Sequence, residues 1–139
     1  VAIGETGLDY FRSEGELDWQ RERFRTHIAA AKRCNKPLII HTREAREDTL
    51  RIMEEEDATE AGGVMHCFAE NWDMARRAMD LGFYISFSGI VTFKSATELQ
   101  EVARRVPADR MLVETDCPYL APQSRRGKRN EPAYLPYIA

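Results

Sequence analysis

The chain has 139 residues, a formal net charge of −3, 43% hydrophobic residues and 31% charged residues. These values fit one compact domain over residues 1–139 and argue against a broadly basic coat for nucleic acid. The three cysteines form no C-x-x-C pair, and no apolar run is long enough to cross a membrane. We therefore expect a cytoplasmic protein without membrane association, and nothing in the sequence indicates an obligate protein partner.

Strand-like and helix-like segments alternate along the chain. In chain order, the sequence predicts a strand over residues 1–3, a helix over 17–34, a strand over 38–40, a helix over 44–56, a strand over 64–65, a helix over 71–81, a strand over 83–87, a helix over 95–106 and a strand over 111–116. Asn71 is expected to cap its helix and Gly82 to end it, while Ser95 and Glu98 predict a capping box. This alternation predicts an α/β fold with a parallel sheet, either covered on both faces or closed into a barrel.

Four polar residues follow the predicted strands: Glu5, His41, His66 and Asp116. The carboxyl ends of parallel strands meet at one edge, so these side chains are expected to share a rim. Two imidazoles and two carboxylates suit Zn²⁺, Mn²⁺ or Mg²⁺, and a bridging glutamate suits a pair of metal ions. Asp116 is then the candidate catalytic base as well as a ligand.

Each of these residues also has a structural interpretation when it is taken alone. A histidine after a strand is commonly a hydrogen-bonded structural residue, Glu5 could pair with a cation, and Asp116 could cap the turn before Pro118. Their coincidence in one chain favours the metal site. Glu114 shares a strand face with Asp116, so it could support a ligand from behind or contact substrate. His27 lies in the middle of a predicted helix and is left outside the site.

A basic segment follows the last predicted strand. Its candidate substrate-binding residues are Arg125, Arg126, Lys128 and Asn130, and Arg43 follows His41 by two positions. Arginine forks suit phosphate oxygens, although the segment could also be a solvated loop. Three aromatic residues near strand ends, Tyr10, Phe68 and Phe93, could stack on bases or belong to the core. Cys67 and Cys117 are expected to pack on the face opposite to the ligands.

Five stretches resemble the TatD family of metal-dependent deoxyribonucleases within the amidohydrolase superfamily. They are "IGETGLDY", "KPLIIHTREA", "GVMHCF", "GFYISFSGIVTF" and "LVETDCPYLAP", in the family's order and covering nearly the whole chain. The resemblance implies a (β/α)8 barrel of the TIM type with two divalent metal ions and hydrolysis of phosphodiester bonds in DNA, often exonucleolytic. It implies that Glu5 bridges the metals, that His41 and His66 bind one, and that Asp116 binds the other and accepts the proton.

The sequence departs from the family pattern in one respect. The family begins with a His-x-His strand, and this chain contains no His-x-His. We therefore expect a partial barrel, about strands 4 to 8, that is poorly stable and inactive when isolated. Two alternatives stay open: a hydrolase of a C–N or ester bond on the same barrel, and a non-catalytic metal-binding or nucleic-acid-binding fragment.

Overall fold

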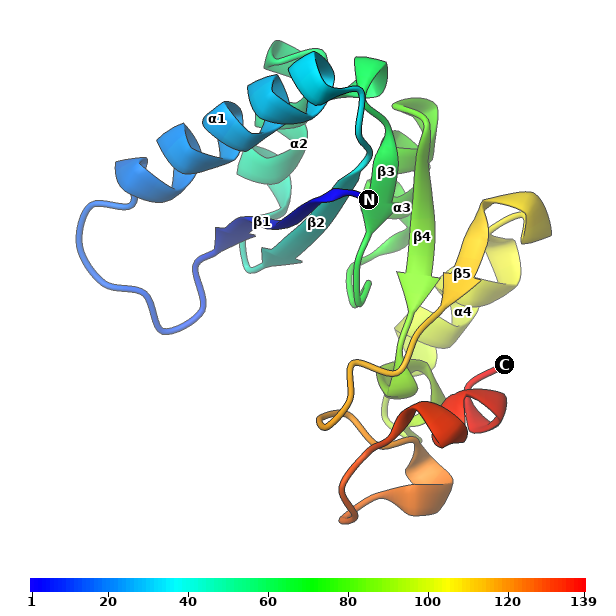
Figure 1. The fold of residues 1–139 in the computed structure, drawn as a ribbon. Helices are drawn as coiled ribbons and strands as arrows, with labels where there is room; N and C mark the ends of the chain where they lie inside the picture. Colours follow the sequence, from blue (N-terminus) through cyan, green and yellow to red (C-terminus); the bar gives the residue numbers. More distant parts are fainter.

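The computed structural model describes residues 1–139 and contains one parallel sheet whose five strands lie side by side in chain order (Figure 1). The strands are β1 (Ile3–Asp9), β2 (Leu38–Arg43), β3 (Gly63–Met65), β4 (Phe83–Phe87) and β5 (Met111–Val113). The connecting helices are α1 (Asp18–Cys34), α2 (Arg46–Glu55), α3 (Trp72–Asp80) and α4 (Thr97–Arg105). Each helix returns the chain to the start of the next strand, so all carboxyl ends lie at one edge.

All the predicted strands and helices are present, but three strands, β1, β2 and β5, differ from the predicted length by three or more residues. β1 continues to Asp9 and β2 to Arg43 instead of stopping at residues 3 and 40, because their pairing extends to Asp9 opposite Arg43 after an irregular register near the start of β1. β5 ends at Val113 instead of Asp116, because the chain leaves the sheet there.

The helices cover one face of the sheet, and alternate strand residues pack against them. The buried members of this face are Leu38, Ile40, Met65, Phe83, Ile85 and Phe87. α1 contributes Phe24 and Ile28 to the same core, and α2 contributes Leu50 and Met53. Burial of each such side chain contributes about 1.5–3 kcal/mol, so this layer is the main source of stability.

The other face of the sheet carries the intervening residues and no helix. Ile39, Val64 and Tyr84 are neighbours in register across β2, β3 and β4, and Leu112 lies on the same face of β5. Tyr84 and Leu112 are 40% and 45% exposed. His41 continues this alternation two residues beyond Ile39. The face that the helices leave open therefore carries polar residues toward the carboxyl edge.

The helix ends test the predicted capping residues. The Asn71 side chain accepts a hydrogen bond from the Met74 N–H, and Gly82 adopts a positive φ of 84° directly after Leu81, the C-cap residue of α3, so both predictions are confirmed. The prediction of a capping box formed by Ser95 and Glu98 is wrong. α4 begins at Thr97 with Ala96 at the cap position and without a side-chain cap, so Ser95 lies one residue too early to cap it.

Gly7 lets β1 approach β2 closely. A Cβ at this position would lie 1.9 Å from the carbonyl oxygen of His41, and Gly7 has a φ of +136°. Any side chain would collide with the backbone and would strain the strand. β1 is thereby held against the segment of β2 that carries His41.

Residues 114–139 contain neither a strand nor an α-helix and fold beyond the carboxyl ends of β4 and β5 (Figure 1, orange to red). Two 3₁₀ helices, Gln123–Arg125 and Pro132–Tyr137, shape this segment. It closely approaches the 3₁₀ helix Gly89–Thr92 that follows β4, because a Cβ at Gly89 would lie 2.0 Å from the Leu120 carbonyl oxygen. No helix of the structure has the length and apolar character that crossing a membrane requires.

Candidate metal centre

The four predicted ligands meet at the carboxyl edge of the sheet. Glu5 Oε1 lies 3.1 Å from His41 Nδ1, and Glu5 Oε2 lies 3.9 Å from His66 Nε2. His66 Nε2 in turn lies 3.6 Å from Asp116 Oδ1. Residues separated by more than one hundred positions in the sequence are thus brought into one cluster, which we call the rim: Glu5, His41, His66 and Asp116.

The rim residues do not all stand at the last position of a strand. Glu5 and His41 lie inside β1 and β2, because both strands extend further than predicted, whereas His66 directly follows β3. Asp116 lies three residues beyond β5. The rim is assembled from two strands and two following turns, and the common edge of the parallel sheet still brings them together.

Two residues of these turns have an unusual backbone conformation. Cys67 and Asp116 adopt φ values of 48° and 54° in the left-handed region, which costs free energy for residues other than glycine. Aspartate tolerates this region better than cysteine does. Strained backbone of this kind persists where surrounding structure fixes it, and here it directs the Asp116 side chain toward His66.

Glu114 lies behind His66 and hydrogen bonds with it. Its Oε1 is 2.6 Å from His66 Nδ1, and its Oε2 accepts the backbone N–H of Cys67 at 3.0 Å. The hydrogen bond to Glu114 raises the pKa of His66. Burial alone would raise the pKa of Glu114, but its hydrogen bonds, first the one from His66, hold it below the ordinary value. The carboxylate therefore stays ionised and orients the ring.

Asp116 is surrounded differently. Burial raises its pKa, and the nearby carboxylates of Glu114 and Glu5 add to this rise, which His66 partly opposes. A carboxylate with a raised pKa binds a proton more readily, which is the property that a general base near neutral pH needs.

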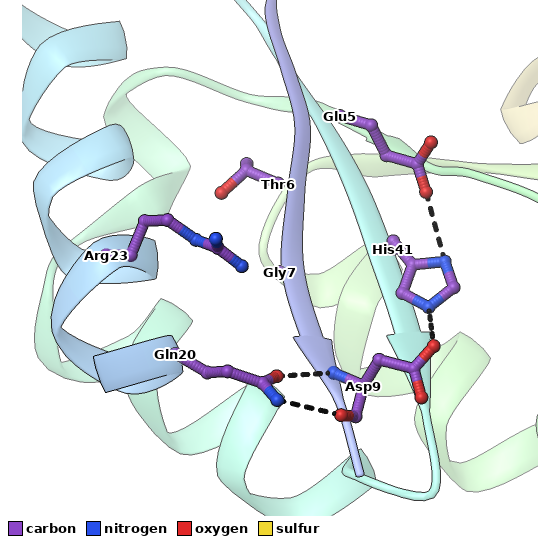
Figure 2. A pocket seen from close by; sticks show the side chains of 7 residues that line it. All are labelled: Glu5, Thr6, Gly7, Asp9, Gln20, Arg23 and His41. Atoms are coloured by element: carbon purple, nitrogen blue, oxygen red, sulfur yellow. Dashed lines mark hydrogen bonds and ion pairs between the residues drawn. The ribbon is translucent and has the colours of Figure 1, made fainter. Parts of the chain in front are cut away.

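His41 has a carboxylate on each side of its ring (Figure 2). Nδ1 faces Glu5, and Nε2 lies 2.9 Å from Asp9 Oδ2. Burial alone would raise the pKa of Asp9, but hydrogen bonds from His41 and Arg43 hold it below the ordinary value. The sequence analysis missed Asp9, although Glu5, Gly7 and Asp9 alternate with the buried Thr6 and Leu8 in a pattern that could have identified it.

The donor atoms at the rim fit divalent cations. His41 Nδ1, His66 Nε2 and the carboxylates of Glu5 and Asp116 all face one region, and this mixture of nitrogen and oxygen suits Zn²⁺ or Mn²⁺. One ligand atom each from His66, Glu114 and Asp116 also lie within 4.8 Å of one another. Because Glu114 is already bonded to His66 Nδ1 and the Cys67 N–H, its geometry is that of a supporting residue.

An open cavity of about 630 Å³ adjoins the rim. Arg43 and Arg46 line it, together with the apolar side chains of Ile90 and Leu120. Arg43 Nε is 3.2 Å from the Asp9 carboxylate, and its guanidinium lies 4.2 Å from the centre of the Phe11 ring. Arg46, which the sequence analysis missed, is held at 3.0 Å by Glu70. The cavity thus has two anchored cations beside the candidate ligands.

The basic segment after β5 is only partly free. Arg125 donates to the Tyr137 hydroxyl at 2.6 Å, and Arg126 lies 4.0 Å from the centre of the Phe93 ring. Lys128 is exposed. Asn130 is buried, and its amide nitrogen donates to the carbonyls of Thr115 at 2.6 Å and Tyr119 at 2.7 Å. Both amide hydrogens of Asn130 are therefore engaged, so these contacts give it a structural role and leave none for a substrate.

The remaining predicted residues have structural contacts. His27 Nδ1 is 2.7 Å from the Thr6 hydroxyl, away from the rim. Phe68 is buried in the core, and Tyr10 donates to Asp48 at 2.7 Å. The prediction that Cys117 packs inward is wrong, because the chain is no longer a strand there and the residue is exposed.

Cys67 is a partly buried thiol beside the rim. Its Sγ lies 3.2 Å from the Ser88 hydroxyl, and burial raises its pKa to about 11. A thiol with such a pKa stays protonated at neutral pH, so Cys67 is a poor candidate for a nucleophile.

Comparisons with known proteins agree on one family. The model of the family described as "TatD related DNase" matches residues 1–139. The chain is 55% identical over its whole length to the metal-dependent hydrolase YcfH of Escherichia coli K12 and 52% identical to YabD of Bacillus subtilis. It is 36% identical over 99% of its length to a protein of Klebsiella pneumoniae named 3′-5′ ssDNA/RNA exonuclease TatD.

The chain spans about half the length of the curated relatives it matches, 52% for YcfH and 54% for the Klebsiella protein. Among solved structures, the TatD homologue YjjV of Escherichia coli superposes with a TM-score of 0.90 at 28% identity, over 99% of this chain and 53% of that one. The expected fold class, part of a (β/α)8 barrel, is confirmed.

Proposed function

The chain belongs to the family of TatD-related DNases, and from this premise we propose that it supplies part of the active site of a metal-dependent hydrolase that cleaves phosphodiester bonds of DNA. The observation that carries the proposal is the convergence of Glu5, His41, His66 and Asp116 at one edge of the sheet. The relative named as a 3′-5′ ssDNA/RNA exonuclease supports a nucleic-acid substrate and exonucleolytic cutting.

The rim residues are proposed to hold two divalent metal ions, Mg²⁺, Mn²⁺ or Zn²⁺. The Glu5 carboxylate, which lies 3.1 Å from His41 and 3.9 Å from His66, would be shared between the two ions, as the family resemblance implies. His41 and His66 are assigned to one ion and Asp116 to the other. Bound divalent ions would neutralise phosphoryl oxygens and lower the pKa of water.

Asp116 is the proposed proton acceptor. The position of its carboxylate at the rim, 3.6 Å from His66, suits the removal of a proton from the attacking water. The water oxygen forms a bond to phosphorus, Asp116 takes the proton, and the bond to the leaving sugar oxygen breaks. That oxygen leaves as a hydroxyl after taking a proton from solvent.

The cavity beside the rim is the proposed site of the substrate phosphates. Arg43, which the sequence analysis assigned to substrate, lines this cavity with Arg46, and anchored guanidinium groups recognise phosphate oxygens well. Arg126 and Lys128 are proposed as outer contacts to the DNA backbone. Arg125 is proposed to act through its hold on Tyr137 in the same segment.

A cytoplasmic location fits the cysteines. All three are free thiols, and Cys34 and Cys117 are exposed. Exposed free thiols are typical of a reducing compartment, where DNA is also available. We propose this location together with the activity.

The test measures nucleotide release from end-labelled DNA by the whole natural protein, with Mg²⁺ or Mn²⁺. Asp116→Ala is expected to lower the rate by about 10²–10⁴-fold, because general-base catalysis and one ligand are lost. Asp109→Ala, an exposed aspartate in the turn before β5, is the matched control and should behave as wild type. If DNA stays intact with every metal, the substrate is another phosphoester, an amide or an ester.

A further inference from the structure

We propose that Asp9 is a positioning residue that holds His41 in the tautomer and orientation in which Nδ1 is free to bind a cation. The inference rests on the proposed metal centre and adds a residue to it. Asp9 lies at the nitrogen of the His41 ring opposite to the one that faces Glu5 (Figure 2).

The first argument comes from the imidazole itself. A neutral imidazole carries one N–H hydrogen, so only one of its nitrogens can donate. His41 Nε2 is 2.9 Å from Asp9 Oδ2, whereas Nδ1 is 3.1 Å from Glu5 Oε1. When the hydrogen is on Nε2, the lone pair of Nδ1 faces the bridging carboxylate, which is the arrangement that a shared cation requires.

The second argument is that Asp9 is fixed from several directions. Gln20, a buried residue of α1, accepts the Asp9 N–H and donates to the Asp9 carbonyl, both at 2.9 Å. Asp9 Oδ1 also accepts the Phe11 N–H at 3.0 Å, and Arg43 Nε lies 3.2 Å from the carboxylate. A buried amide group needs hydrogen-bond partners, and the Gln20 amide finds two of them in the backbone of Asp9. Asp9 is therefore a rigid acceptor for His41.

The third argument is that the two rim histidines are oriented in the same way. Each has a carboxylate on the nitrogen that faces away from the shared region: Asp9 on Nε2 of His41 and Glu114 on Nδ1 of His66. The nitrogens differ, but the result is the same, because each ring presents its other nitrogen to Glu5. Carboxylates that orient liganding histidines in this way commonly change metal affinity by about 10–100-fold.

Calorimetric titration of the whole natural protein with Mn²⁺ tests the proposal. Asp9→Asn is expected to weaken Mn²⁺ binding by about 10–100-fold, because an amide can turn its NH₂ toward Nε2 and favour the wrong tautomer. Asp48→Asn is the matched control: the Asp48 side chain is 32% exposed against 33% for Asp9, and it also binds an arginine, Arg51. The proposal is overturned if the two variants bind Mn²⁺ equally well.

A second measurement does not depend on metal or on a variant. Nitrogen-15 NMR of the metal-free protein at about pH 8.5, where an ordinary histidine is neutral, should show His41 with a protonated Nε2 and an unprotonated Nδ1. The opposite tautomer overturns the proposal, even if Asp9→Asn does not fold. If the wild type binds no Mn²⁺, the proposed metal-dependent function fails, and the tautomer alone then decides the role of Asp9.

Discussion

Replacement of Glu114 distinguishes a residue that orients a metal ligand from a residue that binds the metal ion directly. Its carboxylate accepts from His66 Nδ1 and from the Cys67 N–H. Glu114→Gln keeps the size but loses the charge that orients the ring, so we expect metal affinity to fall by about 10–100-fold while metal still binds. Calorimetry with Mn²⁺ measures this change.

The control for this variant is Glu101→Gln, which changes an exposed glutamate of α4 that pairs only with Arg104. It should leave metal affinity unchanged. Complete loss of binding in Glu114→Gln would instead make Glu114 a ligand in its own right.

At this scale the sequence was informative about which side chains meet at the rim and less so about the residues that hydrogen bond to them. Glu5, His41, His66 and Asp116 could be predicted because each follows or ends an apolar run and parallel strands share an edge. Asp9 was not predicted, because the first strand was expected to cover residues 1–3 only, whereas its true length depends on pairing with β2. Gln20 gave no signal, since its partner is the Asp9 backbone.

At the scale of elements, the segment after β5 depends on Asn130. Its amide holds the carbonyls of Thr115 and Tyr119 from a buried position. Asn130→Ala would leave both carbonyls without these donors, so we expect a loss of about 1–3 kcal/mol in the free energy of unfolding. Asp116 follows Thr115 directly, so hydrolysis should fall as well.

Urea unfolding of the whole natural protein, followed by circular dichroism, measures the effect. Lys128→Ala, an exposed neighbour in the same segment, should change the unfolding free energy by less than about 0.5 kcal/mol. Equal stability of the two variants would mean that the Asn130 contacts do not hold the segment.

The positive charge of this segment could be predicted from the sequence, but the contacts of its arginines could not. The run from Arg125 to Arg129 is evident in the sequence, but the rings that hold Arg125 and Arg126 belong to Tyr137 and Phe93. Phe93 lies more than thirty positions earlier, so no local pattern indicates the contact. The helices were easier, since their periodicity and an N-cap such as Asn71 are local.

At the scale of the molecule, residues 1–139 form an arc with an open face. β1 and β5 are the outer strands of this sheet, and Tyr84 and Leu112 are exposed on the face without helices. Unpaired strand edges and exposed apolar residues promote association. We expect a polypeptide of these 139 residues alone to self-associate and to lack nuclease activity.

Sedimentation velocity on that polypeptide tests the expectation. The double variant Tyr84→Thr/Leu112→Thr should shift the distribution toward monomer, because it removes the two largest exposed apolar groups of the open face. A monodisperse, cooperatively unfolding monomer of the unaltered polypeptide would contradict the prediction.

The contact at Gly7 has a consequence for genetics. Gly7 has no chemical group to offer, yet a methyl group there would meet the His41 carbonyl oxygen and push apart the two strands that carry Glu5, Asp9 and His41. A screen for inactive alleles would recover changes at Gly7 beside those at the charged residues. Such alleles would be inactive because a side chain at Gly7 does not fit between the strands. They could be mistaken for alleles that have lost a catalytic group.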